Sequence, residues 1–502
     1  MRSILLILLL VLPKIMFGEI IYFPDAAFKY KLTHTTYPNY QNFDSNLDGE
    51  IDTTEALAIT NLTIQNTTAI HDLTGIQYFT NLVNLNFSFC RVAQADLHGL
   101  TQLKYVRCDY NYNLFTSLNL SGCSALELLN AHSNPFQNLD LSGCTALKTI
   151  DIHYSSVPVL DLRAAVNLES IIIEYGRINS VLLDVHPLLK TFKASRNLSL
   201  TDLDFSAIPS LETIYVDYCS LQNLKVAQGG NLKNLRCQNN AISELNVSEL
   251  PNLINIECSY NRISELDFRN SLLVRGFNCS HNELTSLLVN KSSPYTSIDC
   301  SYNKLTQLDV ANFGNSFTNL NCSNNLLTDI QLHGNNLLSL DCSYNRFRTL
   351  DLSWLQNLSS LKAQGNYALT YLNLTYNDIT PIQQYKLNLT ENPNLHFVCV
   401  DSFREDFYRA YFASISRRNI RVSSDCGYKT EIYPNPATTD LHLFAMDDMI
   451  TIKIFDMQGK LVDCRYPNYN IADISIANLA TGIYVVEIKT LYATTTHKLY
   501  KI

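Results

Sequence analysis

A unit of about 21 residues recurs along most of this chain, and it constrains the fold more than any other feature. Stretches such as NLKNLRCQNNAISEL and NLINIECSYNRISEL share the pattern LxxLxCxxNxLxxLxV. Six cysteines mark the register at steps of 20 to 22 residues: Cys237, Cys258, Cys279, Cys300, Cys322 and Cys342. A period in this range is typical of a solenoid, in which each coil buries its apolar face only by stacking on its neighbours.

The same phase continues in less regular copies on both sides of these cysteines. Their position is filled elsewhere by small or apolar residues, as a buried row requires: Phe87, Cys108, Ala131, Ile152, Ile173, Ala194, Val216 and Ala363. Three residues later an asparagine recurs: Asn111, Asn134, Asn197, Asn240, Asn261, Asn282, Asn303, Asn325, Asn345 and Asn366. Four copies carry another residue there: Cys90, Ser155, Gly176 and Cys219.

The unit resembles the leucine-rich repeat, whose pattern is LxxLxLxxN/CxL. Alternate residues of a strand share a face, so Leu and Cys of LxxLxC face a core. The resemblance implies a solenoid with a parallel β-sheet on the concave side, and we expect stacked asparagines to bond the backbone of adjacent coils. The short coil leaves no room for a full helix, so the convex side should be mostly irregular or extended. The predicted solenoid spans residues 58–382, followed by a C-terminal cap at 383–427.

The chain has 14 cysteines, but most recur at positions of the repeat where a small apolar side chain suffices. We interpret these as buried, inert thiols rather than as a disulfide ladder. Cys399 and Cys426 lie after the last recognised coil and outside its phase. This pair is predicted to form a disulfide that closes the terminal cap.

The first residues indicate export. Arg2 precedes an apolar run, and no acidic residue occurs before Glu19, so residues 1–18 are predicted to be a signal peptide. No later apolar run is long enough to cross a bilayer, so we expect no transmembrane segment in the mature chain. A net charge of −9 argues against nucleic acid or an anionic membrane as the main partner.

The N-terminal cap, predicted for residues 19–57, contains the acidic stretch FDSNLDGEIDTTE. Its spacing fits the EF-hand loop, in which several oxygens surround a hard cation and a glycine permits the sharp turn. The expected ligand residues are Asp44, Asn46, Asp48, Glu50, Asp52 and Glu55. We therefore predict a structural calcium ion that stabilises this cap. The alternative is an acidic surface turn without a metal.

After Cys426 the sequence changes to short alternating segments separated by turns, which predict a small antiparallel β-sandwich. YPNP at 433–436, the turn at 456–459, LATGIY at 479–484 and the closing KLYKI closely resemble the type A C-terminal sorting domain of the Bacteroidetes type IX secretion system. The resemblance covers residues 428–502. It implies export across the outer membrane by that machinery and removal of the domain on arrival.

The preceding region resembles secreted leucine-rich repeat proteins of flavobacteria and their relatives. FPDAAF near the N-terminus and the DGEI of the acidic loop carry this resemblance together with the repeats. It implies a secreted or outer-membrane cell-surface protein. The coils around Ile152, Ile173 and Ala194 depart from the repeat consensus and carry more varied residues.

This variation is the best sequence clue to function. The earlier coils place aromatic and charged residues at positions that should point outward, whereas the later coils repeat serine at Ser259, Ser280, Ser301, Ser323 and Ser343. Tyrosine and arginine are frequent at binding hot spots. The predicted ligand-binding residues are Tyr105, Arg107, Asp109, Tyr110, Asp151, His153, Tyr154, Glu174, Tyr175, Tyr215, Asp217 and Tyr218. The alternative is that the tyrosines only cover the edge of the strands.

These observations favour a binding protein for a protein or glycan partner, in adhesion or in host or surface interaction. A cell-surface spacer without a specific ligand is the alternative. His132 and His153 lie one coil apart near Asp151 and Glu174, which would suit an acid–base or metal site. However, the sequence contains no nucleophile elbow, HExxH motif or phosphate-binding loop, so we predict no catalytic residues and no enzyme, a hydrolase being the least favoured option.

Overall fold

The computed structural model describes residues 18–34, 42–111, 114–379, 386–417, 420–426, 430–445, 448–490 and 493–502. The predicted signal peptide, apart from Gly18, lies outside these residues. The chain divides into two compact units, Met1–Asn303 and Lys304–Ile502.

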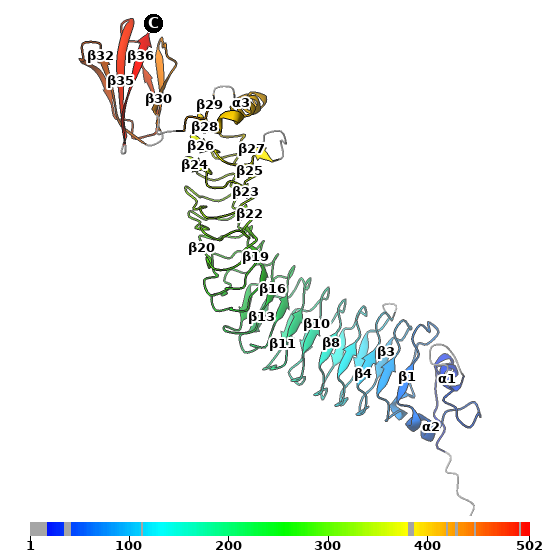
Figure 1. Cartoon of the computed structure of the whole chain (residues 1–502). Helices are drawn as coiled ribbons and strands as arrows, with labels where there is room; N and C mark the ends of the chain where they lie inside the picture. The colour runs from blue at the N-terminus through cyan, green and yellow to red at the C-terminus, as the bar shows by residue number, and fades with distance from the viewer. Residues whose placement is uncertain are drawn as a thin grey trace, which may run out of the picture. The chain divides into compact units, whose positions relative to one another are not determined.

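In the first unit, each coil contributes one short strand to a parallel main sheet. The strands, in spatial order, are β1 (Asn61–Thr63), β2 (Asn84–Asn86), β4 (Tyr105–Arg107), β6 (Leu128–Asn130), β8 (Thr149–Asp151), β10 (Ser170–Ile172), β12 (Thr191–Lys193), β14 (Thr213–Tyr215), β16 (Asn234–Arg236), β17 (Asn255–Glu257), β19 (Gly276–Asn278) and β21 (Ser297–Asp299). Figure 1 shows the labelled members succeeding one another coil by coil. The coil of β1 precedes the first copy recognised from the sequence, because its NLTI lacks the cysteine and the asparagine that mark the pattern.

In the main sheet, each residue pairs with the residue at the equivalent position of the neighbouring repeat. Asn255, Ile256 and Glu257 of β17 pair with Gly276, Phe277 and Asn278 of β19, for example. The central residue of each of these strands is buried, while its two neighbours are more exposed. This alternation follows from the pleat, which sends successive side chains to opposite faces.

The recurring asparagines form the expected ladder. Asn282 Nδ2 donates to the carbonyl oxygens of Cys258 (3.0 Å), one coil back, and Cys279 (3.1 Å), in its own coil. Its Oδ1 accepts the N–H of Ile263 at 3.0 Å. Each side chain therefore satisfies backbone groups that the turn would leave buried and unpaired, which would otherwise be costly.

Cysteine at the asparagine position reproduces part of this bonding. Cys219 Sγ donates to Ala194 O at 3.3 Å and Cys90 Sγ to Ile64 O at 3.2 Å, in each case to the preceding coil. The cysteines of the core position, such as Cys258, are buried thiols outside any disulfide. Both observations agree with the interpretation of these thiols as structural.

The opposite wall of the first unit is extended, as expected from the short coil, and forms short parallel sheets. Their strands are β3 (Gln94–Asp96), β5 (Ser117–Asn119) and β7 (Asn138–Asp140); β9 (Val159–Asp161) and β11 (Ser180–Leu182); β13 (Asp202–Phe205) and β15 (Asn223–Val226); β18 (Glu265–Asp267) and β20 (Ser286–Leu288). The N-terminal cap contains α1 (Ala26–Thr33) and α2 (Thr53–Ala58), and the 3-10 helix η1 (Ile76–Tyr78) follows on this side.

The second unit continues the same plan and then changes it. Its main-sheet strands are β22 (Asn319–Asn321), β23 (Ser339–Asp341), β25 (Ser360–Lys362) and β27 (Leu387–Asn388), and its second sheet contains β24 (Thr349–Asp351), β26 (Tyr371–Asn373), β28 (Phe397–Cys399) and β29 (Arg421–Ser423). The 3-10 helix η2 (Ser402–Arg404) and helix α3 (Glu405–Ser414) complete the cap. Parallel pairing thus extends beyond residue 382, where the sequence analysis placed the end of the solenoid, because LxxNPNLHFV preserves the apolar alternation without the cysteine.

The C-terminal domain has two antiparallel sheets around an apolar core. They contain β30 (Thr430–Tyr433), β31 (Asp440–Ala445) and β34 (Ile471–Ser475); and β33 (Leu461–Arg465), β32 (Met449–Asp456), β35 (Gly482–Thr490) and β36 (Thr494–Lys501). Leu441, Ile454, Val486 and Leu499 are among the buried residues between them. The predicted antiparallel fold of this region is confirmed.

Candidate binding surface

At the end of each main-sheet strand, three positions per coil flank the buried core residue: the one before it and the two after it. In the coil of β14 they are Tyr215, Asp217 and Tyr218, of which the last is the most exposed. The last of the three has a positive φ in every coil and precedes the asparagine position. We call this set, from the coil of β2 to that of β21, the αL row; it comprises Phe89, Tyr110, Ser133, Tyr154, Tyr175, Arg196, Tyr218, Asn239, Tyr260, His281 and Tyr302.

Aromatic residues are an unexpected choice for the αL row. Its φ values lie near +55°, as at Tyr110 (+53°) and Tyr154 (+58°). Glycine and asparagine adopt this conformation at the lowest cost, whereas a bulky side chain there is uncommon. The backbone therefore does not explain the rings, and their reason must lie in what the side chains contact.

The rings of the earlier coils contact one another in an unbroken series. Phe89 stacks on Tyr110 with 5.1 Å between ring centroids, and Tyr154 stacks on Tyr175 at 4.9 Å. Between these pairs, His132 meets Tyr110 edge-on at 5.1 Å and stacks on His153 at 4.2 Å. His153 in turn lies 5.3 Å from Tyr154. We call this series the aromatic ribbon; it comprises Phe89, Tyr110, His132, His153, Tyr154 and Tyr175.

The ribbon is open to solvent. Its tyrosines are 46% to 52% exposed. Such rings present large, rigid contact area and, through their hydroxyl groups, hydrogen-bonding capacity. A soluble protein rarely leaves this much contiguous aromatic surface exposed without a partner.

The two histidines differ in charge environment. Partial burial and the neighbouring His153 lower the pKa of His132, although Asp109 and Asp151 oppose the shift. His153 Nδ1 lies 2.6 Å from Asp151 Oδ1, which orients its ring. At neutral pH His132 is therefore mainly uncharged, and it can stack within the ribbon without repelling its neighbour.

A second group of outward residues alternates cations with tyrosines. Lys193, Tyr215 and Arg236 are aligned on β12, β14 and β16. The Tyr215 ring centroid lies 5.3 Å from Lys193 Nζ and 4.7 Å from Arg236 Cζ. Beside them, Arg196 Cζ lies 4.5 Å from the Tyr218 ring and 5.5 Å from that of Tyr175. We call Lys193, Arg196, Tyr215, Tyr218 and Arg236 the cation–tyrosine cluster.

The structure places some of the ligand-binding residues predicted from the sequence in these two groups and the others beside them. Tyr110, His153, Tyr154 and Tyr175 lie in the ribbon, with Asp151 bound to His153.

The other predicted residues lie in the cation–tyrosine cluster or beside the two groups. Tyr215 and Tyr218 lie in the cation–tyrosine cluster, where Asp217 accepts a hydrogen bond from Ser195 Oγ at 2.7 Å. Asp109 likewise accepts one from Ser88 Oγ at 2.6 Å. Tyr105 and Arg107 are exposed on β4, and Glu174 is half-buried beside Tyr175.

Lys193 and Arg196 were expected to point outward in the earlier coils, but like Arg236 they were not in the set of predicted ligand-binding residues. The signal that could have found them is the period itself, since each cation lies one coil from a tyrosine at the same register. Cation–π contact follows from that juxtaposition, because neighbouring strands of a sheet are about 4.8 Å apart.

The later coils differ from expectation. Ser259, Ser280, Ser301, Ser323 and Ser343 were expected to point outward, but all are buried. Ser301 Oγ, for instance, donates to Asp299 Oδ1 at 2.6 Å. The interpretation of this column as a solvated face is wrong, because the turn into the αL residue folds the small hydroxyl against the strand end.

The later αL row is also aromatic. His281 stacks between Tyr260 and Tyr302 at centroid distances of 4.1 and 4.2 Å. Stacking is therefore not confined to the earlier half. What distinguishes the earlier coils is the addition of cations and varied outward residues.

The acidic loop of the N-terminal cap is held by its own hydrogen bonds. Glu55 is buried, and its Oε1 accepts the N–H of Ser45 at 2.7 Å. Asp44 Oδ2 accepts the N–H of Gly49 at 2.8 Å, and Asp52 caps α2 through Thr54 N at 2.8 Å. Across the described ranges, no group of three or more His, Cys, Asp or Glu side chains is gathered as a metal site.

The donor set of this loop nevertheless fits calcium chemically. Asp44, Asn46, Asp48 and Glu55 supply hard oxygen atoms around one turn, and Gly49 has a φ of +82° that permits it. Glu55 would have to exchange its backbone hydrogen bonds for the ion.

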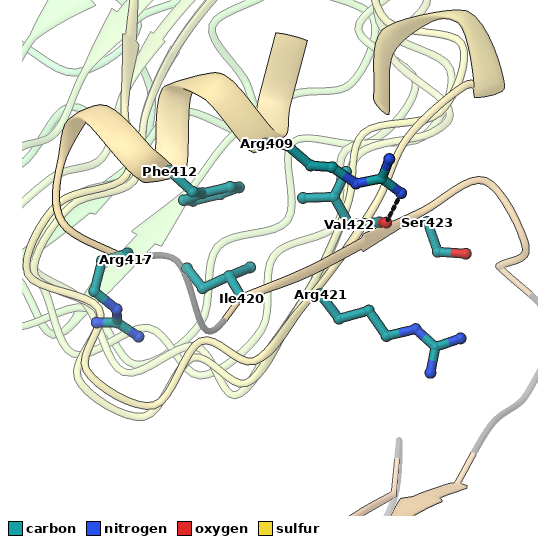
Figure 2. Close-up of a pocket in the computed structure, with 7 residues that line it drawn as sticks. All are labelled: Arg409, Phe412, Arg417, Ile420, Arg421, Val422 and Ser423. Carbon is teal, nitrogen blue, oxygen red and sulfur yellow. Dashed lines mark hydrogen bonds between the residues drawn. The ribbon is translucent and has the colours of Figure 1, made fainter. Parts of the chain in front are cut away.

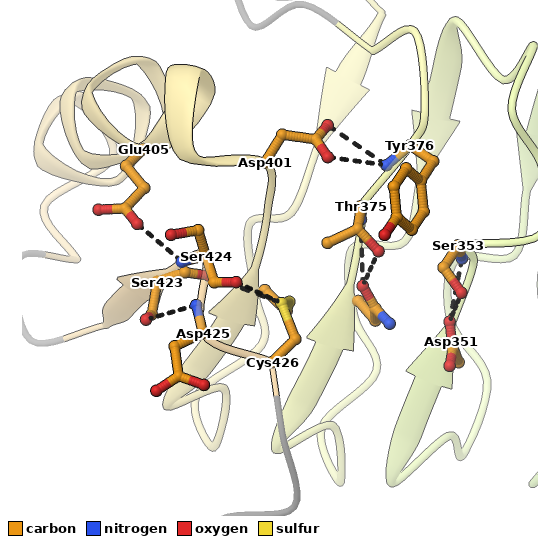
Figure 3. The surroundings of a disulfide bond; sticks show 12 residues. Asp351, Ser353, Thr375, Tyr376, Asp401, Glu405, Ser423, Ser424, Asp425 and Cys426 are labelled. Carbon is orange, nitrogen blue, oxygen red and sulfur yellow. Dashed lines mark hydrogen bonds between the residues drawn. A yellow bond between two sulfur atoms is a disulfide. The ribbon is translucent and has the colours of Figure 1, made fainter.

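The C-terminal cap contains the disulfide pair that the sequence predicted. Cys399 and Cys426 are bonded, with Cα atoms 5.6 Å apart. Figure 3 shows its surroundings, where Glu405 of α3 accepts the N–H of Ser424 at 2.7 Å and Asp401 accepts that of Tyr376 at 3.2 Å. The bond thus ties the strand β28 to the segment that follows β29.

A depression of about 440 Å³ lies in the same cap, beside α3 and β29 (Figure 2). Arg409, Arg417 and Arg421 line it, but each is already engaged. Arg409 pairs with Glu405 at 2.6 Å, Arg421 with Glu431 at 2.6 Å, and Arg417 donates to backbone carbonyls including Asn392 O at 2.8 Å. These contacts mark the depression as part of the cap rather than as a ligand site.

Comparison with known proteins gives two kinds of match. Residues 431–501 match the family model of the secretion system C-terminal sorting domain. Among solved structures, the functional domain of InlJ from Listeria monocytogenes, which includes a cysteine ladder, superposes with a TM-score of 0.50 at 18% identity, over 97% of this chain and 99% of that one. This chain has the leucine-rich repeat fold.

Two further structures are more distant. YopM from Yersinia enterocolitica gives a TM-score of 0.44 at 19% identity, over 64% of this chain and 78% of that one. The internalin InlF from Listeria monocytogenes gives 0.34 at 18% identity, over 75% and 95%. No curated protein matches this sequence. Within the described residues, no helix is long and apolar enough to cross a membrane.

Proposed function

We propose that this protein is an exported binding protein whose solenoid recognises a protein or glycan partner through the outward side chains of its earlier coils. The contact surface would combine the aromatic ribbon with the cation–tyrosine cluster. Tyr105 and Arg107 on β4 would extend it. Recognition of this kind suits adhesion or interaction with a host or bacterial surface.

The observation that carries this proposal is the exposed aromatic occupation of the αL row, which in the earlier coils is joined by cations and varied outward residues. Tyr154 and Tyr175 are 52% and 46% exposed at backbone positions that favour glycine or asparagine. Stacking between neighbouring coils offsets part of the backbone cost, but it also holds the rings in one geometry. A pre-ordered aromatic surface loses little conformational entropy when a partner binds.

The sorting domain supports the part of the proposal that concerns export. Residues 431–501 match a secretion system sorting domain, and the sequence motifs of this region resemble those of type IX sorting domains. We infer that the domain brings the chain to the type IX machinery, and that the solenoid is released or displayed at the cell surface.

A binding assay with purified full-length protein would test the function. Arrays of purified extracellular proteins and of purified glycans would be probed with the wild type and with Tyr154→Ala, Arg107→Ala and Tyr215→Ala. Each substitution should weaken binding by about 1–3 kcal/mol, the range of interface hot spots, without unfolding the chain.

Tyr302→Ala is the matched control, because Tyr302 occupies the αL row and is 50% exposed but lies in the later coils. It should change binding little. Equal losses for Tyr154→Ala and Tyr302→Ala would show that recognition extends along the whole row. A complete absence of array binding by the wild type would instead favour a spacer.

We also propose that the loop from Asp44 to Glu55 binds calcium and stabilises the N-terminal cap. The spacing of the oxygen donors supports this proposal. Asp44, Asn46, Asp48, Asp52 and Glu55 would contribute side chains and Glu50 its carbonyl.

A further inference from the structure

The cation–tyrosine cluster has an ordered composition. Along one row, Lys193, Tyr215 and Arg236 alternate on β12, β14 and β16. Along the adjacent αL row, Arg196 lies between Tyr175 and Tyr218. Each cation is thus held against the face of at least one ring, an arrangement that positions the charged group while leaving its N–H groups free to bond outward.

Lys193, Arg196 and Arg236 differ from other cations of these coils in their lack of ion pairs within the described residues. None of the three forms an ion pair with another residue of the described chain. Cations elsewhere in the same coils do, as Lys233 with Glu212 at 2.8 Å and Lys225 with Asp204 at 3.2 Å. The cluster therefore presents cations without a salt-bridged carboxylate among the described residues, although Glu257 on β17 stands opposite Arg236 in the strand register.

We propose that Lys193, Arg196 and Arg236 together form a carboxylate-binding site for an acidic segment of a protein partner. The inference rests on the proposed binding function and names the chemistry recognised within it. Guanidinium groups suit carboxylates because they can donate two parallel hydrogen bonds. Tyr215 and Tyr218 keep the cations in place and add apolar contact.

The surrounding charges favour a protein over an acidic polysaccharide. Glu174, Asp217 and Glu257 lie in the same coils as the cations or in neighbouring ones, so the surface is a mosaic of both signs. A polymer with a negative charge on every unit would be repelled by these carboxylates. A protein segment can place single carboxylates opposite the cations and neutral or basic groups opposite the acids.

Two of these acids relate differently to the cations. Asp217 accepts a hydrogen bond from Ser195 Oγ at 2.7 Å. Glu257 stands opposite Arg236 in the strand register, where burial raises the pKa of its carboxyl group and the Arg236 charge opposes the rise. Glu257 therefore offsets part of the Arg236 charge, whereas Lys193 and Arg196 have no such carboxylate in register on a neighbouring strand of the described structure.

The test uses the full-length protein and three probes. The first is a synthetic peptide of about twelve residues in which Glu is separated by Thr and an occasional Lys; the second carries Gln in place of each Glu; the third is polygalacturonate. The triple variant Lys193→Gln, Arg196→Gln and Arg236→Gln is compared with a control triple, Arg163→Gln, Lys225→Gln and Lys233→Gln. The control removes the same charge from cations that have carboxylate partners.

The Glu peptide should bind the wild type, and the Gln peptide should not. The triple variant should lose about tenfold or more in affinity, which corresponds to about 1.4 kcal/mol, whereas the control triple should lose less than about twofold. Tyr215→Leu should weaken binding several-fold at unchanged net charge, and Tyr215→Phe should retain it, because the ring face rather than the hydroxyl holds the cations.

Three outcomes would overturn the assignment. Equal losses of affinity in both triple variants would show that the Glu peptide is bound by general charge attraction rather than by this cluster. Tighter, cluster-dependent binding of polygalacturonate would assign the site to an acidic polysaccharide. No binding of the Glu peptide would remove the carboxylate site, yet leave the proposed function intact if array binding still depended on Tyr154.

Discussion

At the scale of single residues, the repeat is held by side chains that complete the backbone hydrogen bonds of their neighbours. The asparagine ladder and its cysteine replacements serve the same carbonyl groups on successive coils. The αL residue just before each asparagine is left outside this network. Its identity is therefore free to vary with function, whereas the asparagine and the buried core residue are fixed by packing.

Asn303→Ala should destabilise the solenoid by about 2–4 kcal/mol, because it leaves buried backbone groups unpaired. Asn303 Nδ2 donates to Cys279 O and Cys300 O, both at 3.0 Å, and its Oδ1 accepts Leu284 N at 2.9 Å. Denaturant unfolding measures the loss. Asn179→Ala is the control, since its exposed side chain has no hydrogen bond in the described structure; equal losses would contradict the ladder's role.

The free thiols should differ sharply in reactivity. Burial raises the pKa of Cys258 to about 12, so at pH 8 only roughly one part in ten thousand is the reactive thiolate. Cys464 is partly exposed. Alkylation of the native protein followed by peptide mass analysis should modify Cys464 and spare Cys258 until denaturant is added. Rapid native labelling of Cys258 would show that the coils open readily.

At the scale of elements, the short strands stabilise one another by stacking, and the caps cover the ends of the stack. Strands of three residues cannot be stable alone, and they persist because each is paired on both sides and buries its central residue. The ends of such a stack need covering. The first helices and the acidic loop cover one end, and α3 with its disulfide belongs to the cap of the other.

Calcium should raise the melting temperature of the full-length protein. At about 5 mM, which exceeds the roughly millimolar dissociation constants of extracellular calcium modules, binding would stabilise the native state by about 1 kcal/mol. Asp48→Ala should remove most of this gain in melting temperature, because it deletes one of the proposed calcium ligands. Apart from that, it removes an exposed local hydrogen bond, which Asp48 Oδ1 accepts from Glu50 N. Asp72→Ala, which deletes a similar exposed turn bond outside the loop, is the control. A calcium response unchanged by Asp48→Ala would refute the site.

At the scale of the whole molecule, the chain combines a repetitive scaffold with a domain of different construction. The coils are parallel and mostly local in their pairing, whereas the C-terminal sheets are antiparallel around a core of their own. This separation fits the proposed division of labour between binding and export.

Deletion of residues 430–502 should strand the chain in the periplasm of a host with an intact type IX system. The full-length protein should instead reach the surface or the medium, shortened at its C-terminus. Fractionation with an antibody against the solenoid, combined with mass spectrometry of the C-terminus, measures both. Normal surface display of the deleted form would contradict the role of the domain.

The sequence by itself determined the period, the buried positions and the type of fold. The reason is physical: a fixed spacing of Leu, Cys and Asn can be buried in only one register once coils stack. It also identified Cys399 and Cys426, the acidic loop and the sorting domain, because these stand outside the repeat. The predicted range of the solenoid, 58–382, includes β1, but parallel pairing continues past it, since β27 keeps the backbone path of a coil without the marker residues.

Only the tertiary structure decided which side chains share a surface. The serine column reads as polar and outward, yet the αL turn buries it, and no pattern of residue types reveals that turn. The contacts of Tyr215 with Lys193 and Arg236 join residues 22 and 21 positions away in the sequence, since residues of adjacent coils become neighbours only when the coils stack. A repeat fixes its own core through local spacing, whereas its binding surface depends on the alignment of many coils.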